Sequence, residues 1–148
     1  MRRIVAHEEL CMGCTLCQVY CTLAHSSSGD PIKAYRRETP RPRPRIKLAQ
    51  DKPQSMAVQC HHCKDPACVN ACLTGAMHVD ETTGNVLHDE DKCIGCWTCV
   101  MVCPFGALVV EPDISKNPLK CDLCPNLKVP ACVANCPNEA LVLEEVVD

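Results

Sequence analysis

Sixteen cysteines in a chain of 148 residues limit what this sequence can fold into. They fall into four groups of four, and no cysteine is left over. A cysteine content this high indicates a cross-linked scaffold. Aromatic side chains, which usually dominate a hydrophobic core, make up only 3 % of the chain. We therefore expect a group bound by the cysteines to form a large part of the core.

The spacing of the cysteines within each group of four indicates what they bind. The first and third groups share the spacing C-x2-C-x2-C-x3-C, the second has C-x2-C-x4-C-x3-C, and the fourth has C-x2-C-x7-C-x3-C. In order along the chain, the groups are Cys11, Cys14, Cys17 and Cys21; Cys60, Cys63, Cys68 and Cys72; Cys93, Cys96, Cys99 and Cys103; and Cys121, Cys124, Cys132 and Cys136. A C-x2-C-x2-C loop presents three thiolates to one iron–sulfur cubane, while the fourth cysteine, on a helical turn, serves a neighbouring cluster. Gly13 and Gly95 suit such loops, because a residue without Cβ lets the backbone approach the inorganic sulfides.

Zinc and disulfides are the alternatives to iron. Structural zinc usually takes two C-x2-C pairs separated by a longer spacer, and a triple C-x2-C-x2-C would overfill such a site. Cysteines three apart in a tight loop pair poorly as disulfides. The start of the chain lacks an apolar segment long enough for a signal peptide, and no run of 18 apolar residues is present. We therefore expect a protein of the cytoplasm without membrane insertion. Disulfides are rare in the cytoplasm.

An internal repeat indicates the fold class. The segments 72–79, 103–110 and 136–143 each begin with a closing cysteine and continue through a turn into a short apolar strand. A further strand is expected at 4–6, and the turn at 82–85 predicts a hairpin of 77–79 with 86–88. The expected fold is α+β, with short helices and small antiparallel sheets.

These motifs resemble those of the four-cluster ferredoxin-like electron-transfer subunits. Members of that family accompany carbon-monoxide dehydrogenase, tungsten aldehyde oxidoreductase, formate dehydrogenase and enzymes of the dimethyl-sulfoxide-reductase type. The resemblance spans residues 11–136 and departs from many relatives in the short, seven-residue spacer of the fourth group. It implies four [4Fe–4S] clusters, each bound by three cysteines of one group and one of another. The implied ligands are the Cys96 set (Cys72, Cys93, Cys96 and Cys99), the Cys63 set (Cys60, Cys63, Cys68 and Cys103), the Cys124 set (Cys21, Cys121, Cys124 and Cys132) and the Cys14 set (Cys11, Cys14, Cys17 and Cys136).

The resemblance also implies an architecture and a function. Two interleaved bacterial-ferredoxin-like lobes, with two clusters each, would comprise residues 56–112 and residues 1–25 plus 113–148 of one polyferredoxin unit. The chain would be no enzyme itself but would pass electrons between a catalytic oxidoreductase subunit and a flavoprotein, hydrogenase or ferredoxin. Carbon-monoxide dehydrogenase is the favoured partner, ahead of tungsten or molybdenum enzymes that act on aldehydes or formate. A free, diffusible polyferredoxin is the alternative.

Residues 26–55 form a basic arm between the first two groups. The stretch 31–52 holds eight of the fifteen Lys and Arg residues and carries a formal charge of +6, whereas the whole chain carries −3. Alternating Pro and Arg at 40–45 favours an extended polyproline II backbone. The arm is either a solvated loop or a docking strap for an acidic partner. We expect no nucleic-acid binding, because clustered aromatic residues for base stacking are absent.

Other conspicuous residues are not expected to bind iron or to catalyse a reaction. His61 and His62 lie in a group that already has four cysteines, so we expect them beside a cluster or exposed rather than bound to iron. Trp97 is expected to shield a cluster from water. The sequence contains no phosphate-binding loop and no dinucleotide fingerprint, and no catalytic residue is predicted.

Overall fold

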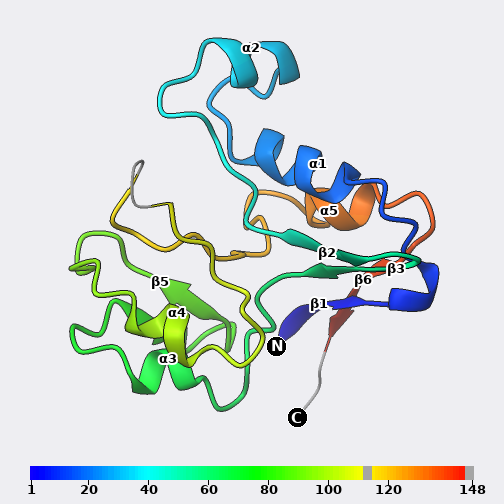
Figure 1. Cartoon of the computed structure of the whole chain (residues 1–148). Coiled ribbons are helices and arrows are strands. Elements are labelled where there is room, and N and C mark those ends of the chain that lie inside the picture. Colours follow the sequence, from blue (N-terminus) through cyan, green and yellow to red (C-terminus); the bar gives the residue numbers. More distant parts are fainter. Residues whose placement is uncertain (112–114, 146–148) are drawn as a thin grey trace.

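A computed structural model describes residues 1–111 and 115–145 of the chain. Three two-stranded antiparallel sheets and several short helices make up the regular structure (Figure 1). The α+β class, the short helices and the small antiparallel sheets are therefore confirmed. The division into two lobes stays a prediction. No helix in the described part of the chain is long and apolar enough to cross a membrane.

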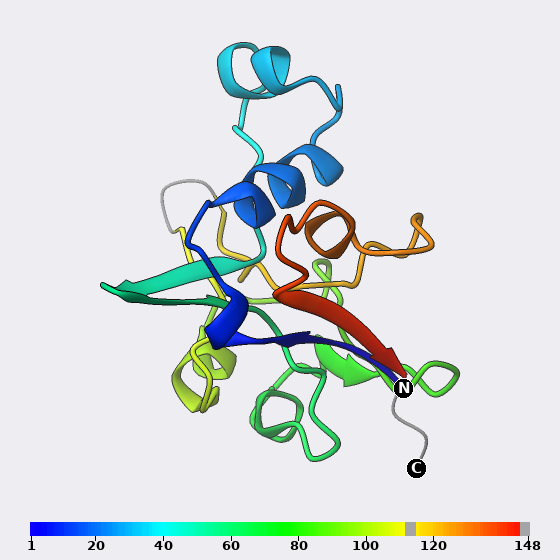
Figure 2. The same cartoon turned by 90° about the vertical axis from the view of Figure 1, so that its right-hand side faces the viewer.

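The two ends of the chain lie together. Strand β1 (Arg2–Ala6) pairs with β6 (Leu141–Glu145), with Ile4 opposite Leu143. Helix α1 (Leu16–Ala24) packs beside α5 (Ala131–Ala134), and Figure 2 shows both pairs side by side. A short 3-10 helix, η1 (Glu8–Leu10), leads from β1 to the first cysteine group.

The middle of the chain forms a second helix pair with its own hairpin. Helix α3 (Ala67–Asn70) packs against α4 (Thr98–Val102). Strands β4 (Met77–Val79) and β5 (Val86–His88) form the hairpin expected from the sequence. The strand expected at 107–110 is reduced to one bridge, between Val109 and Leu119. Pro118 precedes Leu119 and has no N–H with which to continue a ladder.

The arm at 26–55 is only partly extended. Helix α2 (Pro31–Arg36) begins at Asp30, whose carboxylate accepts hydrogen bonds from the N–H groups of Ile32 and Lys33, both at 2.9 Å. In Figure 1 this helix stands away from the rest of the molecule. Residues 41–44 have no regular structure, and strand β2 (Lys47–Asp51) then pairs with β3 (Gln54–Val58).

Cysteines are part of both buried cores. The larger core combines Ile4, Ile46 and Leu141 with Cys17, Cys21, Cys60, Cys121 and Cys132. The smaller core joins Met77 and Leu108 to Cys99. Apolar side chains thus surround the thiols, and the expectation that a group bound by the cysteines forms a large part of the core stays a prediction.

Candidate metal centres

Each cysteine group places its last two members one helical turn apart. The pairs are Cys17 and Cys21 in α1, Cys68 in α3 with Cys72 after it, Cys99 in α4 with Cys103 after it, and Cys132 in α5 with Cys136 after it. Residues four apart lie on the same face of a helix, about 6 Å apart along its axis. Each short helix can therefore supply cysteines to two neighbouring sites, and the two helices of a packed pair can share the same two sites.

Two cavities are lined by cysteines from two different groups. One is bordered by all four members of the Cys14 set, together with apolar residues such as Leu48, Ala57 and Leu141. The other is bordered by all four members of the Cys63 set, together with Val86, Phe105 and Leu108. In each cavity three thiols come from one group and the fourth comes from the group on the partner helix. Four thiols converging on one apolar cavity fit a cubane and exceed what a disulfide can use.

The remaining eight cysteines influence one another electrostatically. Burial raises the pKa of the Cys132 thiol, and nearby Cys121, Cys21 and Cys124 raise it further. Burial also raises the pKa of Cys99 to about 11, with added effects of Cys68, Cys93 and Cys72. The pKa of the Cys96 thiol is lowered, chiefly by the hydrogen bond from Thr98, and nearby Cys72 opposes that shift. These influences act between members of the Cys124 set and between members of the Cys96 set, with Cys68 of the Cys63 set also acting on Cys99. The ligand assignments of these two sets stay a prediction.

Contacts between the sets indicate a linear order. Cys99 of the Cys96 set is influenced by Cys68 of the Cys63 set, and Cys121 of the Cys124 set by Cys60. Cys17 and Cys21 join the Cys14 and Cys124 sets through helix α1. We infer from these neighbours the order Cys96 set, Cys63 set, Cys124 set, Cys14 set for the implied sites. Of the sixteen cysteines, only Cys14 and Cys96 are exposed, and they belong to the two ends of this row.

Hydrogen bonds to sulfur suit thiolate ligands. The amide of Arg45 donates to Cys21 Sγ at 3.2 Å, and the amide of Met77 donates to Cys72 Sγ at 3.4 Å. At Cys72, burial raises the pKa, but the hydrogen bonds from Met77 and Thr74 outweigh it and hold the pKa below its ordinary value. Such N–H groups stabilise negative charge on sulfur and adjust the reduction potential of a bound cluster.

The two glycines of the C-x2-C-x2-C loops have positive φ angles, 70° at Gly13 and 73° at Gly95. A Cβ on Gly95 would lie 2.9 Å from Cβ of Lys116, and one on Gly13 would lie 2.5 Å from Nε2 of Gln50. The missing side chains therefore make room for neighbouring segments. The close approach of these loops to the sulfides of a cluster stays a prediction.

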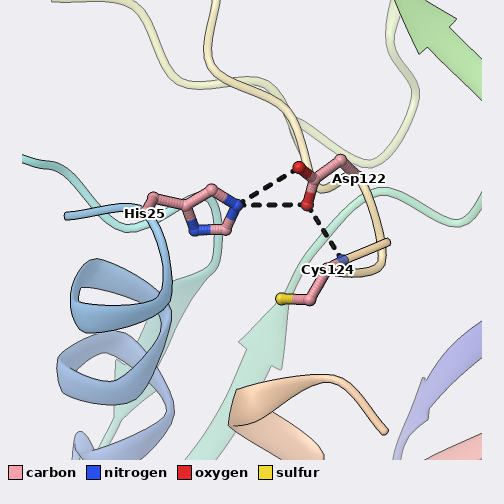
Figure 3. A group of neighbouring side chains, drawn as sticks. All are labelled: His25, Asp122 and Cys124. Carbon is pink, nitrogen blue, oxygen red and sulfur yellow. Dashed lines mark hydrogen bonds and ion pairs between the residues drawn. The ribbon is translucent and has the colours of Figure 1, made fainter. Parts of the chain in front are cut away.

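A polar network borders the Cys124 set (Figure 3). His25 Nε2 lies 3.1 Å from Asp122 Oδ1, and Nδ1 lies 2.7 Å from the carbonyl oxygen of Cys21. Both ring nitrogens face acceptors, so the imidazole is a double donor. Burial lowers the pKa of His25, but the bonds to Asp122 and Cys21 outweigh burial and raise it to about 9.

His25, Asp122 and Cys124 lie close enough to hold a separate metal ion. The carboxylate of Asp122 is already engaged, however, because it accepts hydrogen bonds from the Cys124 amide at 3.0 Å and from Arg45 Nη1 at 2.7 Å. Cys124 itself belongs to an implied cluster site. We therefore interpret this group as support for the cysteine loop at 121–124.

The other residues singled out in the sequence lie beside cysteine sites. The ring of His61 stacks on Phe105 with centroids 4.1 Å apart, and both line the cavity of the Cys63 set. His62 is completely buried, and its Nδ1 accepts a hydrogen bond from the amide of Val86 at 3.2 Å. Trp97 Nε1 donates to the carbonyl of Lys116 at 2.8 Å. Sequence reasoning missed the buried Lys120, which also lines the cavity of the Cys63 set.

Comparisons with known proteins agree with this geometry. Residues 53–146 match the family described as a 4Fe-4S dicluster domain. Electron transport protein HydN of Escherichia coli is 36 % identical over 157 residues, which cover 95 % of this chain and 86 % of HydN. "Putative oxidoreductase AegA" of the same species is 37 % identical over 150 residues, but the chain spans only 22 % of its length.

A solved structure shares the fold. A chain of the active site complex BamBC of benzoyl coenzyme A reductase superposes with a TM-score of 0.51 at 24 % sequence identity, covering 97 % of this chain and 79 % of that one. The match to the family covers most of the chain, and HydN is matched over most of its length. The chain therefore belongs to the 4Fe-4S dicluster family of ferredoxin-like iron–sulfur electron-transfer proteins.

Proposed function

We propose that this chain holds four [4Fe–4S] clusters in a row and passes single electrons along them. The observation that carries the proposal is the lining of the two cavities. Each is bordered by four cysteines, three from one sequence group and one from another. The family resemblance implies this exchange for all four sites. The electrostatic neighbourhoods of the other two sets support the same pattern.

The protein's part in this function is to bind the clusters, to set the distances between them and to shield them from water. Bound [4Fe–4S] clusters supply one-electron chemistry. The cysteine thiolates hold them, and apolar residues such as Ile4, Leu108 and Leu141 keep water from them. Backbone amides directed at sulfur, as at Cys21 and Cys72, favour the negatively charged ligands. No catalytic residue is proposed.

The ends of the row are the points where electrons would enter and leave. Cys14 is exposed beside Met12, which is 61 % exposed, and Cys96 is exposed beside Ile94, which is 62 % exposed. Apolar side chains next to an exposed ligand suit contact with a second redox protein, because they exclude water from the path. We propose a catalytic oxidoreductase subunit at one end and a flavoprotein, hydrogenase or ferredoxin at the other.

Carbon-monoxide dehydrogenase remains the catalytic partner that we favour. A tungsten aldehyde oxidoreductase and a formate dehydrogenase are the next candidates. The preference rests on the resemblance of the cysteine pattern and not on an individual residue.

The projecting part of the arm is proposed as a docking element for an acidic surface of that partner. Ile32 and Tyr35 of α2 are each 67 % exposed, and Arg41 stacks over the Tyr35 ring at 4.7 Å. The carboxylates of Asp30 and Glu38 are engaged by backbone amides: Asp30 caps α2, and Glu38 accepts hydrogen bonds from the Ser27 and Ser28 amides. Exposed Tyr and Arg on a fixed element are typical of interfaces.

Metal analysis tests the proposal directly. The anaerobically purified chain should be brown and should contain about sixteen iron and sixteen acid-labile sulfide ions per molecule, as four cubanes require. About eight of each would remove half of the proposed row. A colourless protein that contains zinc would refute the proposal.

Purification from the native cell tests the partner. Nickel and a large subunit in the same fraction would support carbon-monoxide dehydrogenase, whereas tungsten or molybdenum would favour aldehyde or formate chemistry. If no partner is retained at any salt concentration, the chain is a free polyferredoxin and the arm is a solvated loop.

A further inference from the structure

Lys120 is a buried lysine directly before the fourth cysteine group. Its side chain is only 5 % exposed, and its ammonium donates hydrogen bonds to the carbonyl oxygens of Val86 and Cys121, the latter at 2.8 Å. Within residues 1–111 and 115–145, no carboxylate forms an ion pair with it. A buried charge is unfavourable unless an opposite charge balances it. The position therefore calls for a negative group.

The acids near Lys120 do not supply that charge. Glu90 and Asp122 border a pocket together with Lys120. Asp122 is engaged by Arg45 at 2.7 Å and by His25 at 3.1 Å. Glu90 is exposed, where solvent and salt screen its charge.

On another side, Lys120 faces the thiols. It lines the same cavity as Cys60, Cys63, Cys68 and Cys103, which together make up the Cys63 set. Its hydrogen bond to the carbonyl oxygen of Cys121 places the same ammonium at the start of the fourth cysteine group. Lys120 thus adjoins both of the two middle sets.

The side chain is held in place by what it binds. Val86 accepts a hydrogen bond from Lys120 through its carbonyl group and donates one from its amide to His62 Nδ1 at 3.2 Å. Val86 is 1 % exposed and His62 is completely buried. The ammonium is therefore fixed between the β5 strand and the 120–121 segment, on the boundary of the two middle sites.

We propose that Lys120 supplies the fixed positive charge between the two middle clusters and thereby raises the reduction potential of the cluster bound by the Cys63 set. This inference rests on the proposed function. In the transfer step, one electron leaves a neighbouring cluster and enters this one, and no proton or bond is exchanged. The acceptor gains one negative charge. A nearby cation in a medium of low dielectric constant stabilises that charge, so reduction becomes more favourable.

The test is a redox titration of the intact, iron-loaded chain followed by electron paramagnetic resonance. We would compare the wild type with Lys120→Gln, Lys120→Met and Lys120→Arg. The matched control is Lys47→Met, because Lys47 also donates to two carbonyl groups, those of Gly106 and Leu108, but lines none of the cysteine cavities described here.

In the Gln and Met variants, at least one midpoint potential should fall by 59 mV or more. That shift corresponds to a tenfold lower ratio of reduced to oxidised cluster at a fixed potential. Lys120→Arg should stay near the wild type, and Lys47→Met should leave all potentials unchanged. Loss of about four iron ions in the neutral variants, with retention in the Arg variant, would equally support a requirement for the charge.

Two results would overturn the inference. One is unchanged potentials in a fully loaded Lys120→Gln protein. The other is equal loss of iron in the Gln and Arg variants, which would mean that the shape of the lysine matters and its charge does not. Both results leave the proposed function intact, because that fails only if the wild type lacks the iron and sulfide of four cubanes.

Discussion

Arg45 and Asp122 join the end of the basic arm to the fourth cysteine group, with Nη1 and Oδ2 at a distance of 2.7 Å. The amide of Arg45 also donates to Cys21 Sγ, and Asp122 accepts from the Cys124 amide. Arg45 thus contacts Cys21, one implied ligand of the Cys124 set, directly. Through Asp122 it also supports the loop that carries Cys124. The arm is part of this site's structure as well as a surface element.

Replacing Asp122 should weaken iron binding by the Cys124 set in particular. Asp122→Asn removes the charge that His25 and Arg45 share, and a hydrogen bond to a charged group contributes about 1.5–3 kcal/mol. We expect a chelator to remove about four of the iron ions roughly tenfold faster than from the wild type. The measurement is the time course of iron release under anaerobic conditions.

Arg43→Gln provides the control for that experiment. Arg43 pairs with Glu111 at 2.9 Å, but its side chain is 46 % exposed and it lines neither of the two cysteine cavities. An exposed ion pair of this kind contributes little. If both variants release iron equally fast, the network around Asp122 has no special role at the cysteine loop.

Alanine at Gly95 should disturb its loop more than alanine at Gly75. Both glycines have positive φ, 73° and 67°, so each substitution carries a similar backbone penalty of about 1–2 kcal/mol. Only at Gly95 would the new Cβ meet another residue, at 2.9 Å from Lys116, whereas nothing lies within 4 Å at Gly75. We expect a lower temperature for loss of visible absorbance in Gly95→Ala than in Gly75→Ala, and equal temperatures would argue against crowding.

The cysteine spacing predicted much of this architecture because ligand geometry is local. A short helix carries the third cysteine of each group, and the hairpin at 77–79 and 86–88 forms where the turn residues indicated. The pairing of the two ends through β1 and β6 is a long-range contact that the residues alone did not predict. Strand pairing depends on which surfaces tertiary folding brings together, and short apolar segments do not encode it individually.

The arm was the weakest part of the sequence prediction. The alternation of Pro and Arg indicated an extended backbone at 40–45, but helix α2 before it was missed, although Asp30 followed by Pro31 is a helix start signal. The burial of Ile46 at 2 % exposure was also missed. A single apolar residue at the end of a basic stretch gives no periodic pattern, so its place in the core appears only in three dimensions.

These contacts change how the docking role of the arm should be tested. Deleting residues 36–47 would remove Arg45 and the buried Ile46 and would damage the cysteine site. Substituting Tyr35 with Ser and Arg41 with Gln instead should leave the iron content unchanged, because both side chains are exposed. If the arm binds an acidic partner, the doubly substituted chain should lose its co-purifying subunit at a salt concentration that the wild type withstands. If the doubly substituted chain keeps its co-purifying subunit as well as the wild type does, the arm is a solvated loop and not a docking element.

Paired cysteine substitutions provide the sharpest test of the exchange between groups. Cys72 and Cys68 belong to one sequence group, but the implied ligand sets divide them, and Cys72 is assigned with Cys96. Cys72→Ser with Cys96→Ser should therefore damage one site and cost about four iron ions per chain. Cys72→Ser with Cys68→Ser should damage two sites and cost about eight. Iron and sulfide analysis of the two double variants distinguishes the outcomes. If the same-group variant loses only one cluster, the cysteines of the second group bind a single cubane by themselves, and the helix pair α3 and α4 does not exchange ligands.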